Sequence, residues 1–268
     1  MIRTAAAFIK RDCLQDISYR TGFVLKLMGV LFTSAILYFL TNVFGGTASI
    51  FLKPYGGKFF PFVLIGVALL DYHTLSLQIF SNSIRESQLM GTLEIMLLSP
   101  TRLSAIVCYS SLWGYIFTSF RFILYLMTGI LIFGLNLQQA NLIGASLVLG
   151  LSIVCFAGLG IITASIIMLI KEASSVNLIL GAVSLMIGGV AYPVDVLPHW
   201  LRQLSVLLPV AHSLNAMRQA LLQGYSLVQL TPELLKLIAF AGILLPGGLL
   251  AFQLVVRRVK FTGTLGHY

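Results

Sequence analysis

The chain has 268 residues, of which 58% are hydrophobic and only 9% are charged, and its mean hydropathy is +0.98. Soluble globular domains carry roughly 25% charged residues, so this composition excludes an ordinary water-soluble fold. The formal net charge is +9, but the basic residues are scattered between long apolar stretches, which does not favour a nucleic-acid partner. The 3 cysteines are isolated from one another and indicate neither a disulfide framework nor a metal cluster.

Residues 1–20 precede the first long apolar run. Their apolar members recur at helical spacing: Ile2, Ala6, Ile9, Cys13 and Ile17. Because Lys10 and Arg11 point away from this stripe, we expect a helix that lies along the cytoplasmic leaflet, with its cations near anionic lipid headgroups. The alternative is a solvated basic tail. Asp16 lies near the apolar stripe and fits the interfacial helix poorly.

Six apolar runs are long enough to cross the ~30 Å hydrocarbon core as helices. They are Gly22–Phe44, Phe59–Phe80, Ser104–Phe133, Asn141–Ile170, Ala173–Tyr192 and Leu234–Val256. The sequence therefore predicts an all-α, polytopic membrane protein in which residues 1–268 form one transmembrane domain. The third and fourth runs exceed the length that the core requires, so we expect them to tilt or to project from it.

The basic residues divide unequally between the two sides of the membrane. With six spans, one side carries Arg3, Lys10, Arg11, Arg20, Lys26, Arg85, Arg102, Lys171, Arg257, Arg258 and Lys260. The other side carries Lys53, Lys58, Arg202, Arg218 and Lys236. Cytoplasmic loops are enriched in Lys and Arg, so both termini are expected in the cytoplasm.

The cytoplasmic loop between the second and third runs contains a candidate amphipathic helix, residues 84–98. Leu89, Leu93 and Met96 form one apolar stripe in it, and Pro100 should end the helix because proline disfavours helical geometry at the residue before it. Such a helix can float on lipid or dock into a groove on a cytoplasmic partner.

The outer segment 193–223 is too apolar for a free loop. Pro198 and Pro209 each suit the first turn of a new helix. We expect two short helices, half sunk into the outer leaflet or re-entrant, because they satisfy the backbone there better than irregular chain would.

Two ionisable residues lie well inside the predicted spans. Asp71 and Arg121 are each 12 residues from the outer end of their span, which places both about 18 Å deep at 1.5 Å per residue. Equal depth and opposite charge favour an ion pair, and the alternative is that they face a translocation cavity. Nearby His73 is expected to be a buried, hydrogen-bonded group.

Glycines in the fourth and fifth runs are expected at helix contacts, where small residues permit close approach. They are Gly158, Gly160, Gly181, Gly188 and Gly189.

Two segments carry a family resemblance. The cytoplasmic loop E-S-Q-L-M-G-T-L-E-I-M-L-L-S-P-T-R resembles the coupling helix of type-2 ATP-binding-cassette (ABC) permeases. The residues that match its pattern are Glu86, Gly91, Thr92, Glu94 and Pro100. The outer segment is similar to the signature that follows the fifth span of that family. The matching residues there are Gly189, Tyr192, Pro193, Leu197, Pro198, Trp200, Leu204, Pro209 and Arg218.

The resemblance implies a half-transporter of the bacterial inner membrane. Two such permeases, as a homodimer, would enclose a pathway, and two ABC ATPase subunits would move it through the coupling helix. The resemblance also implies an outer gate that includes Tyr192, Pro193, Pro198, Trp200 and Pro209. No cofactor is expected on this chain, because its Gly57-Lys58 pair lacks the preceding glycine of a phosphate-binding loop and ATP would be used by the partner.

Two other functions stay open at this stage. An ion-coupled carrier would need no ATPase, and Asp71 is its plausible coupling acid. A membrane-embedded lipid-modifying enzyme would need converging polar groups, whereas the four histidines are dispersed. The cargo expected for an ABC exporter is an amphiphilic drug, lipid or glycan.

Overall fold

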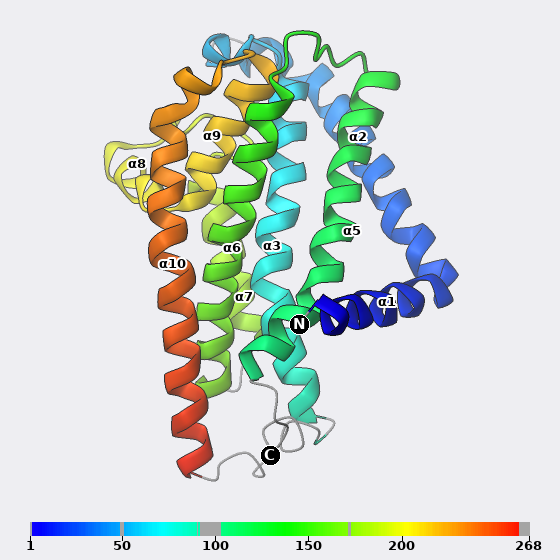
Figure 1. The fold of residues 1–268 in the computed structure, drawn as a ribbon. Helices are drawn as coiled ribbons and strands as arrows, with labels where there is room; N and C mark the ends of the chain where they lie inside the picture. The colour runs from blue at the N-terminus through cyan, green and yellow to red at the C-terminus, as the bar shows by residue number, and fades with distance from the viewer. Residues whose placement is uncertain (1, 49–50, 90, 92–102, 171–172, 263–268) are drawn as a thin grey trace.

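The computed structural model describes residues 2–48, 51–89, 91, 103–170 and 173–262 (Figure 1). Within these ranges the chain is helical almost throughout and has no strand, which confirms the predicted all-α class. The helices are α1 (Ile2–Ser18), α2 (Arg20–Ala48), α3 (Phe59–Leu89), α5 (Leu103–Leu131), α6 (Leu142–Ile170), α7 (Ala173–Ile187), α8 (His199–Val206), α9 (Pro209–Leu222) and α10 (Leu227–Thr262). Two short 3₁₀ turns join them, η1 (Lys53–Tyr55) and η2 (Val194–Val196).

Among the residues that the structure describes, five helices are long and apolar enough to cross a membrane: α2, α3, α5, α6 and α10. The segment predicted as a fifth span, Ala173–Tyr192, forms only the 15 residues of α7. At 1.5 Å per residue α7 is about 22 Å long, less than the ~30 Å hydrocarbon core. It ends at Ile187 because the chain turns at Gly189, whose φ of +77° favours glycine.

Two other helices, α3 and α10, extend furthest beyond the predicted spans. α3 continues past Phe80 to Leu89, so the first residues of the predicted helix 84–98 belong to the last turns of α3. α10 begins at Leu227 and ends at Thr262, and it contains both Pro232 and Pro246.

The core of the bundle is formed where α3 and α6 pack together and α10 packs on α6 (Figure 1). Glycines bring these backbones close. A Cβ on Gly160 would lie 2.0 Å from the carbonyl oxygen of Ser76 in α3, and one on Gly158 would lie 2.6 Å from the carbonyl carbon of Leu244 in α10. These two positions confirm the predicted role of small residues. Gly181 is different, because a Cβ there would meet nothing within 4 Å.

α1 lies roughly perpendicular to the bundle at the end where α10 also ends (Figure 1). Its Asp16 accepts hydrogen bonds from the Trp113 indole of α5 at 2.7 Å and from Lys26 of α2 at 2.8 Å. Burial raises the pKa of Asp16, but these two hydrogen bonds and the Lys26 charge outweigh it and hold the pKa below its usual value. Asp16, which fits the predicted apolar stripe of α1 poorly, therefore joins α1 to both α2 and α5.

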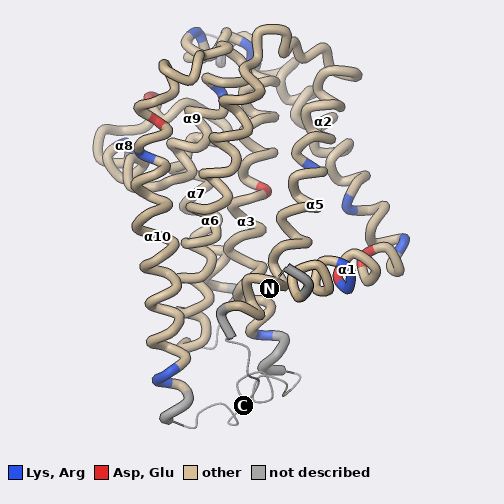
Figure 2. Tube along the Cα trace, in the orientation of Figure 1, with Lys and Arg blue, Asp and Glu red and all other residues tan. Residues whose placement is uncertain are grey.

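Charged residues gather at the two ends of the bundle and along α1, and few lie between them (Figure 2). This distribution agrees with an apolar belt of membrane thickness between two aqueous faces.

Candidate functional site

Asp71 of α3 and Arg121 of α5 face each other across the two helices. Arg121 Nη2 lies 2.8 Å from Asp71 Oδ2. The Asp71 side chain keeps 22% of its surface exposed and the Arg121 side chain 26%, so one side of the pair lies at the surface of the single chain. The structure therefore shows the predicted ion pair, and the pair is partly exposed at the surface of the single chain.

Further polar contacts connect α3 and α5 along their length. They are Tyr72 Oη to Ser119 Oγ (2.9 Å), Ser76 Oγ with Tyr115 Oη (2.7 Å) and Ser83 Oγ with Ser110 Oγ (3.4 Å). Because hydrogen bonds in an apolar medium are not weakened by competing water, this series holds the two helices in one register. We call these contacts, together with Asp71–Arg121, the α3–α5 ladder.

The ladder ends close to the predicted coupling segment. Glu86 lies in the last turns of α3, and Gly91 forms a turn with a φ of +66°. Thr92, Glu94 and Pro100 lie outside the described residues. The coupling residues thus stay a prediction, and what the structure adds is the helix that leads into them.

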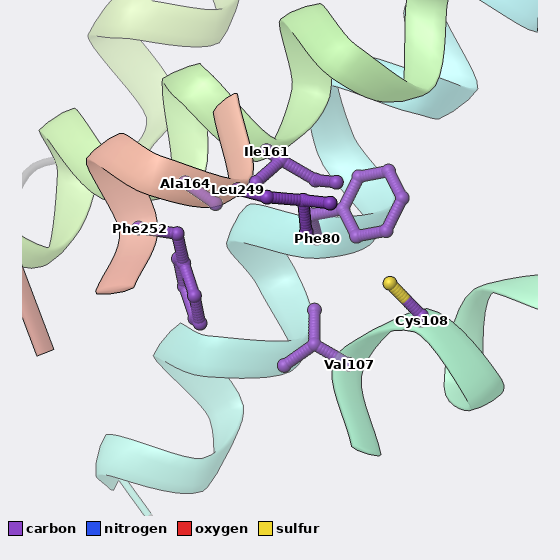
Figure 3. Close-up of a pocket in the computed structure, with 7 residues that line it drawn as sticks. All are labelled: Phe80, Val107, Cys108, Ile161, Ala164, Leu249 and Phe252. Atoms are coloured by element: carbon purple, nitrogen blue, oxygen red, sulfur yellow. The ribbon is translucent and has the colours of Figure 1, made fainter. Parts of the chain in front are cut away.

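A small pocket lies among α3, α5, α6 and α10 (Figure 3). Its lining is apolar: Phe80, Val107, Cys108, Ile161, Ala164, Leu249 and Phe252. The pocket has a volume of about 10 Å³, at the lower limit for one water molecule. It is therefore a packing defect and too small for a transported solute.

The outer segment consists of the turn η2 and the helices α8 and α9. Pro193 precedes η2, Pro198 caps α8, and Pro209 is the first residue of α9, where its missing N–H costs no hydrogen bond. The hydroxyl of Tyr192 donates to the carbonyl of Met186 at the end of α7.

α8 presents apolar side chains outward. Trp200 is 63% exposed, and three more large apolar residues around it are exposed: Leu204, Val206 and Leu207. Leu201 of the same helix is buried. An aromatic and aliphatic face of this kind suits the membrane interface or a partner surface.

Arg218 of α9 is buried, with only 3% of its surface exposed. Its guanidinium donates to the carbonyls of Phe62 (3.2 Å), Gly189 (2.8 Å) and Val190 (2.7 Å). The guanidinium carbon also lies 3.4 Å from the centre of the Phe62 ring. Arg218 therefore fastens the turn after α7 to the start of α3, which gives a structural reason for an arginine at this place in the outer motif.

A second polar cluster joins α9 to α10. His212 Nδ1 lies 2.9 Å from Glu233 Oε2, and its Nε2 lies 3.0 Å from the carbonyl of Val206. Asn215 donates to the other Glu233 oxygen at 3.3 Å and accepts from the Tyr55 hydroxyl at 2.9 Å. Sequence reasoning missed this cluster, because its members come from three separate segments and no spacing relates them.

His73 is the buried, hydrogen-bonded group that the sequence predicts. Only 2% of its surface is exposed, and its Nε2 lies 2.7 Å from Ser184 Oγ of α7. Throughout the ranges that the structure describes, no three His, Cys, Asp or Glu side chains gather closely enough to hold a metal ion.

Comparison with known protein families identifies the family of this chain. A family model described as ABC-2 type transporter matches residues 6–222, well over half of the chain. The match covers most of α1 and every element from α2 to α9, including the Asp71–Arg121 pair, the segment after α3 and the outer helices. No curated protein matches the chain.

Proposed function

Since the chain belongs to the ABC-2 type transporter family and is therefore a membrane permease of the ABC type, we propose that it forms half of an export pathway driven by two separate ATPase subunits. The family match carries this proposal, and the geometry of α3 and α5 suggests how the drive reaches the membrane. ATP would be bound and hydrolysed on the partner, and no cofactor on this chain takes part.

The coupling segment after α3 is the proposed contact with the ATPase, through Glu86, Gly91, Thr92, Glu94 and Pro100. ATP-driven closure of the two ATPases would displace this segment as a rigid body. α3 leads into the segment and α5 follows it, and the α3–α5 ladder joins the two helices. A displacement of the cytoplasmic ends of α3 and α5 would thus move Asp71 and Arg121 as well, because the two joined helices would move as one rigid unit.

A second copy of the chain would complete the pathway. The exposed apolar side chains of α7 support this: Leu178, Ile179, Val183, Leu185 and Met186. Gly181 lies among them with open space beside it, so another helix could approach closely there. In a homodimer built in this way, the open side of the Asp71–Arg121 pair would meet water or substrate in the shared cavity.

The outer helices would form the exit gate with Tyr192, Pro193, Pro198, Trp200 and Pro209. α9 is held firmly by Arg218 and His212, whereas α8 has few buried side chains. This contrast supports α9 as the fixed base of the gate and α8 as its movable part.

The placement that fits these roles is a multi-pass protein of the bacterial inner membrane with both termini in the cytoplasm. α7 and the turn after it would make the sixth crossing. The cargo we propose is an amphiphile, a drug, lipid or glycan. An ion-coupled carrier is less well supported, because its only plausible acid, Asp71, is already paired with Arg121.

The coupling proposal predicts the effect of a charge reversal at Glu94. The chain should co-purify with an ABC ATPase, and Glu94→Lys should insert and fold normally because it lies in a cytoplasmic loop. In sealed vesicles, the complex with Glu94→Lys should still hydrolyse ATP but export no cargo, because the contact that transmits the movement is disrupted. Both rates are measured on the same preparation.

Asp12→Lys is the matched control, because it makes the same charge change on α1, outside the coupling segment. It should keep hydrolysis and export coupled. Normal export by Glu94→Lys, or purification of an active exporter without any ATPase, would overturn the proposal.

A further inference from the structure

A second, larger pocket lies at the end of the bundle opposite α1. It has a volume of about 290 Å³ and is enclosed by α2, the loop before α3, the first turn of α3 and the chain after α5. The residues on which its chemistry depends are Tyr38 and Thr41 of α2, Lys58 and Phe60 at the start of α3, and Phe133 after α5.

Three aromatic rings build the wall of this pocket. The ring of Tyr38 lies 4.7 Å from that of Phe133 and 5.7 Å from that of Phe60, and the last two rings are 5.3 Å apart. One helical turn closer to the membrane centre, Ser34 Oγ of α2 and Thr128 Oγ1 of α5 lie 3.3 Å apart and are buried. The contact between α2 and α5 closes the pocket on that side, so only a compact group fits inside.

The pocket carries positive charge. Lys58 is exposed, and no ion pair joins it to an acid in the described part of the chain. It is followed immediately by the N-terminus of the 31-residue helix α3, whose first turn contains no acidic residue. The unpaired N–H groups and the positive end of the helix dipole therefore add to the charge of Lys58. A ligand with an anionic group would therefore complement the positive charge of this site.

Exposed apolar side chains lie on α2 and at the end of α5, the segments that line the pocket. Phe39 and Val43 of α2 are 66% and 73% exposed, and Leu131 and Ile132 at the end of α5 are 74% and 62% exposed. A ligand with a small anionic head and long hydrocarbon chains would satisfy both parts of this surface, whereas a free anion would use only the charged part.

We propose that this pocket binds the headgroup of an anionic phospholipid from the leaflet opposite α1. The phosphate would accept from Lys58 and from the Tyr38 hydroxyl, the glycerol part would lie against the Phe133 and Phe60 rings, and the acyl chains would lie on the exposed faces of α2 and α5. The site binds lipid as a resident partner at the junction of three helices, apart from the coupling segment.

Native mass spectrometry of the purified full-length chain tests this proposal. The wild type should retain bound phosphatidylglycerol when this lipid is added. It should not retain phosphatidylcholine added at the same concentration. Lys58→Gln should lower the phosphatidylglycerol affinity by about fivefold, the effect of one cation at a membrane surface. Lys58→Arg should restore it. Lys53→Gln is the matched control, because Lys53 is an exposed lysine of the same loop that does not line the pocket.

Two results would overturn the proposal. One is an equal loss of phosphatidylglycerol in Lys58→Gln and Lys53→Gln, which would show that only general surface charge attracts the lipid. The other is displacement of the lipid by glycerol phosphate at concentrations similar to those of the lipid itself, which would show that the site recognises a soluble anion. Phe133→Ala should lower the affinity for phosphatidylglycerol. It should not change how well glycerol phosphate displaces the bound lipid. The experiment needs no ATPase, so its outcome is independent of the Glu94 experiment.

Discussion

Asp71 and Arg121 show how single residues can be tolerated deep in a membrane. A lone charge at the centre of a membrane helix costs about 3 kcal/mol on insertion scales. The two side chains form an ion pair at 2.8 Å, so each offsets the cost of the other. Their pairing could be predicted from the sequence, because the rise of a helix places both at the same depth.

Removing one partner should therefore be more harmful than exchanging both. Asp71→Asn leaves Arg121 without its counter-charge and should destabilise the chain by about 3 kcal/mol. The double variant Asp71→Arg/Arg121→Asp should recover most of this loss. Denaturant unfolding in detergent micelles gives the three free energies of unfolding.

Asp12→Asn is a suitable control because it breaks the exposed Arg11–Asp12 pair on α1 and should cost less than about 1 kcal/mol. If Asp71→Asn cost no more than Asp12→Asn, the pair would contribute little to folding.

Arg218 and Glu233 were harder to predict. The family resemblance marks Arg218, but the sequence does not reveal that its partners are three backbone carbonyls. Glu233 falls at the edge of an apolar run and looks like an ordinary boundary residue, whereas the structure places it against His212 and Asn215. Contacts between distant segments depend on how helices pack, which residue spacing within one segment does not record.

At the scale of helices, hydropathy predicted which segments are helical but not where each helix ends. The polar residues from Ser81 to Leu89 remain helical in α3, because a helix ends where its hydrogen bonding is interrupted and this stretch contains neither Gly nor Pro. α7 shows the opposite case. Val190 and Tyr192 are apolar enough to extend the predicted span, but the chain has already turned at Gly189.

The contact between α3 and α6 depends on Gly160. Gly160→Ala should destabilise the chain by about 1–3 kcal/mol, because its Cβ would lie 2.0 Å from the Ser76 carbonyl and the helices would have to separate. Gly150→Ala, in the same helix, meets nothing within 4 Å and should be neutral or stabilise α6 by up to about 1 kcal/mol. Thermal unfolding of the two variants makes the comparison. Equal effects would mean that the backbones are not in close contact at Gly160.

At the scale of the whole molecule, five helices in the described ranges have the length of a membrane span, and α7 is shorter. α1 and the end of α10 lie at one end of the bundle, and η1 lies towards the other (Figure 1). The sequence predicts that both termini share one side, because it predicts an even number of spans, and the uneven distribution of Lys and Arg predicts that this side is cytoplasmic. It does not locate a transport pathway, because in the proposed homodimer the conduit would lie between two copies of the chain.

Cysteine labelling tests the six-crossing topology. In a variant whose 3 native cysteines are replaced, Lys53→Cys and Asp195→Cys should react with a membrane-impermeant maleimide added to intact cells. Arg11→Cys and Arg257→Cys should react only after the membrane is opened, because the proposed topology places them on the cytoplasmic side. Reaction of Asp195→Cys only after opening would show that α7 does not complete a crossing.

The attachment of α1 to α5 through Asp16 and Trp113 has a mechanical consequence for the transport cycle. A tilt or vertical shift of α5 must carry α1 with it, and α1 lies crosswise to the bundle. If α1 lies among the headgroups, each transport cycle must move this helix sideways through the headgroup layer of the bilayer. The rate of the transport cycle would then depend on membrane fluidity as well as on the nucleotide concentration.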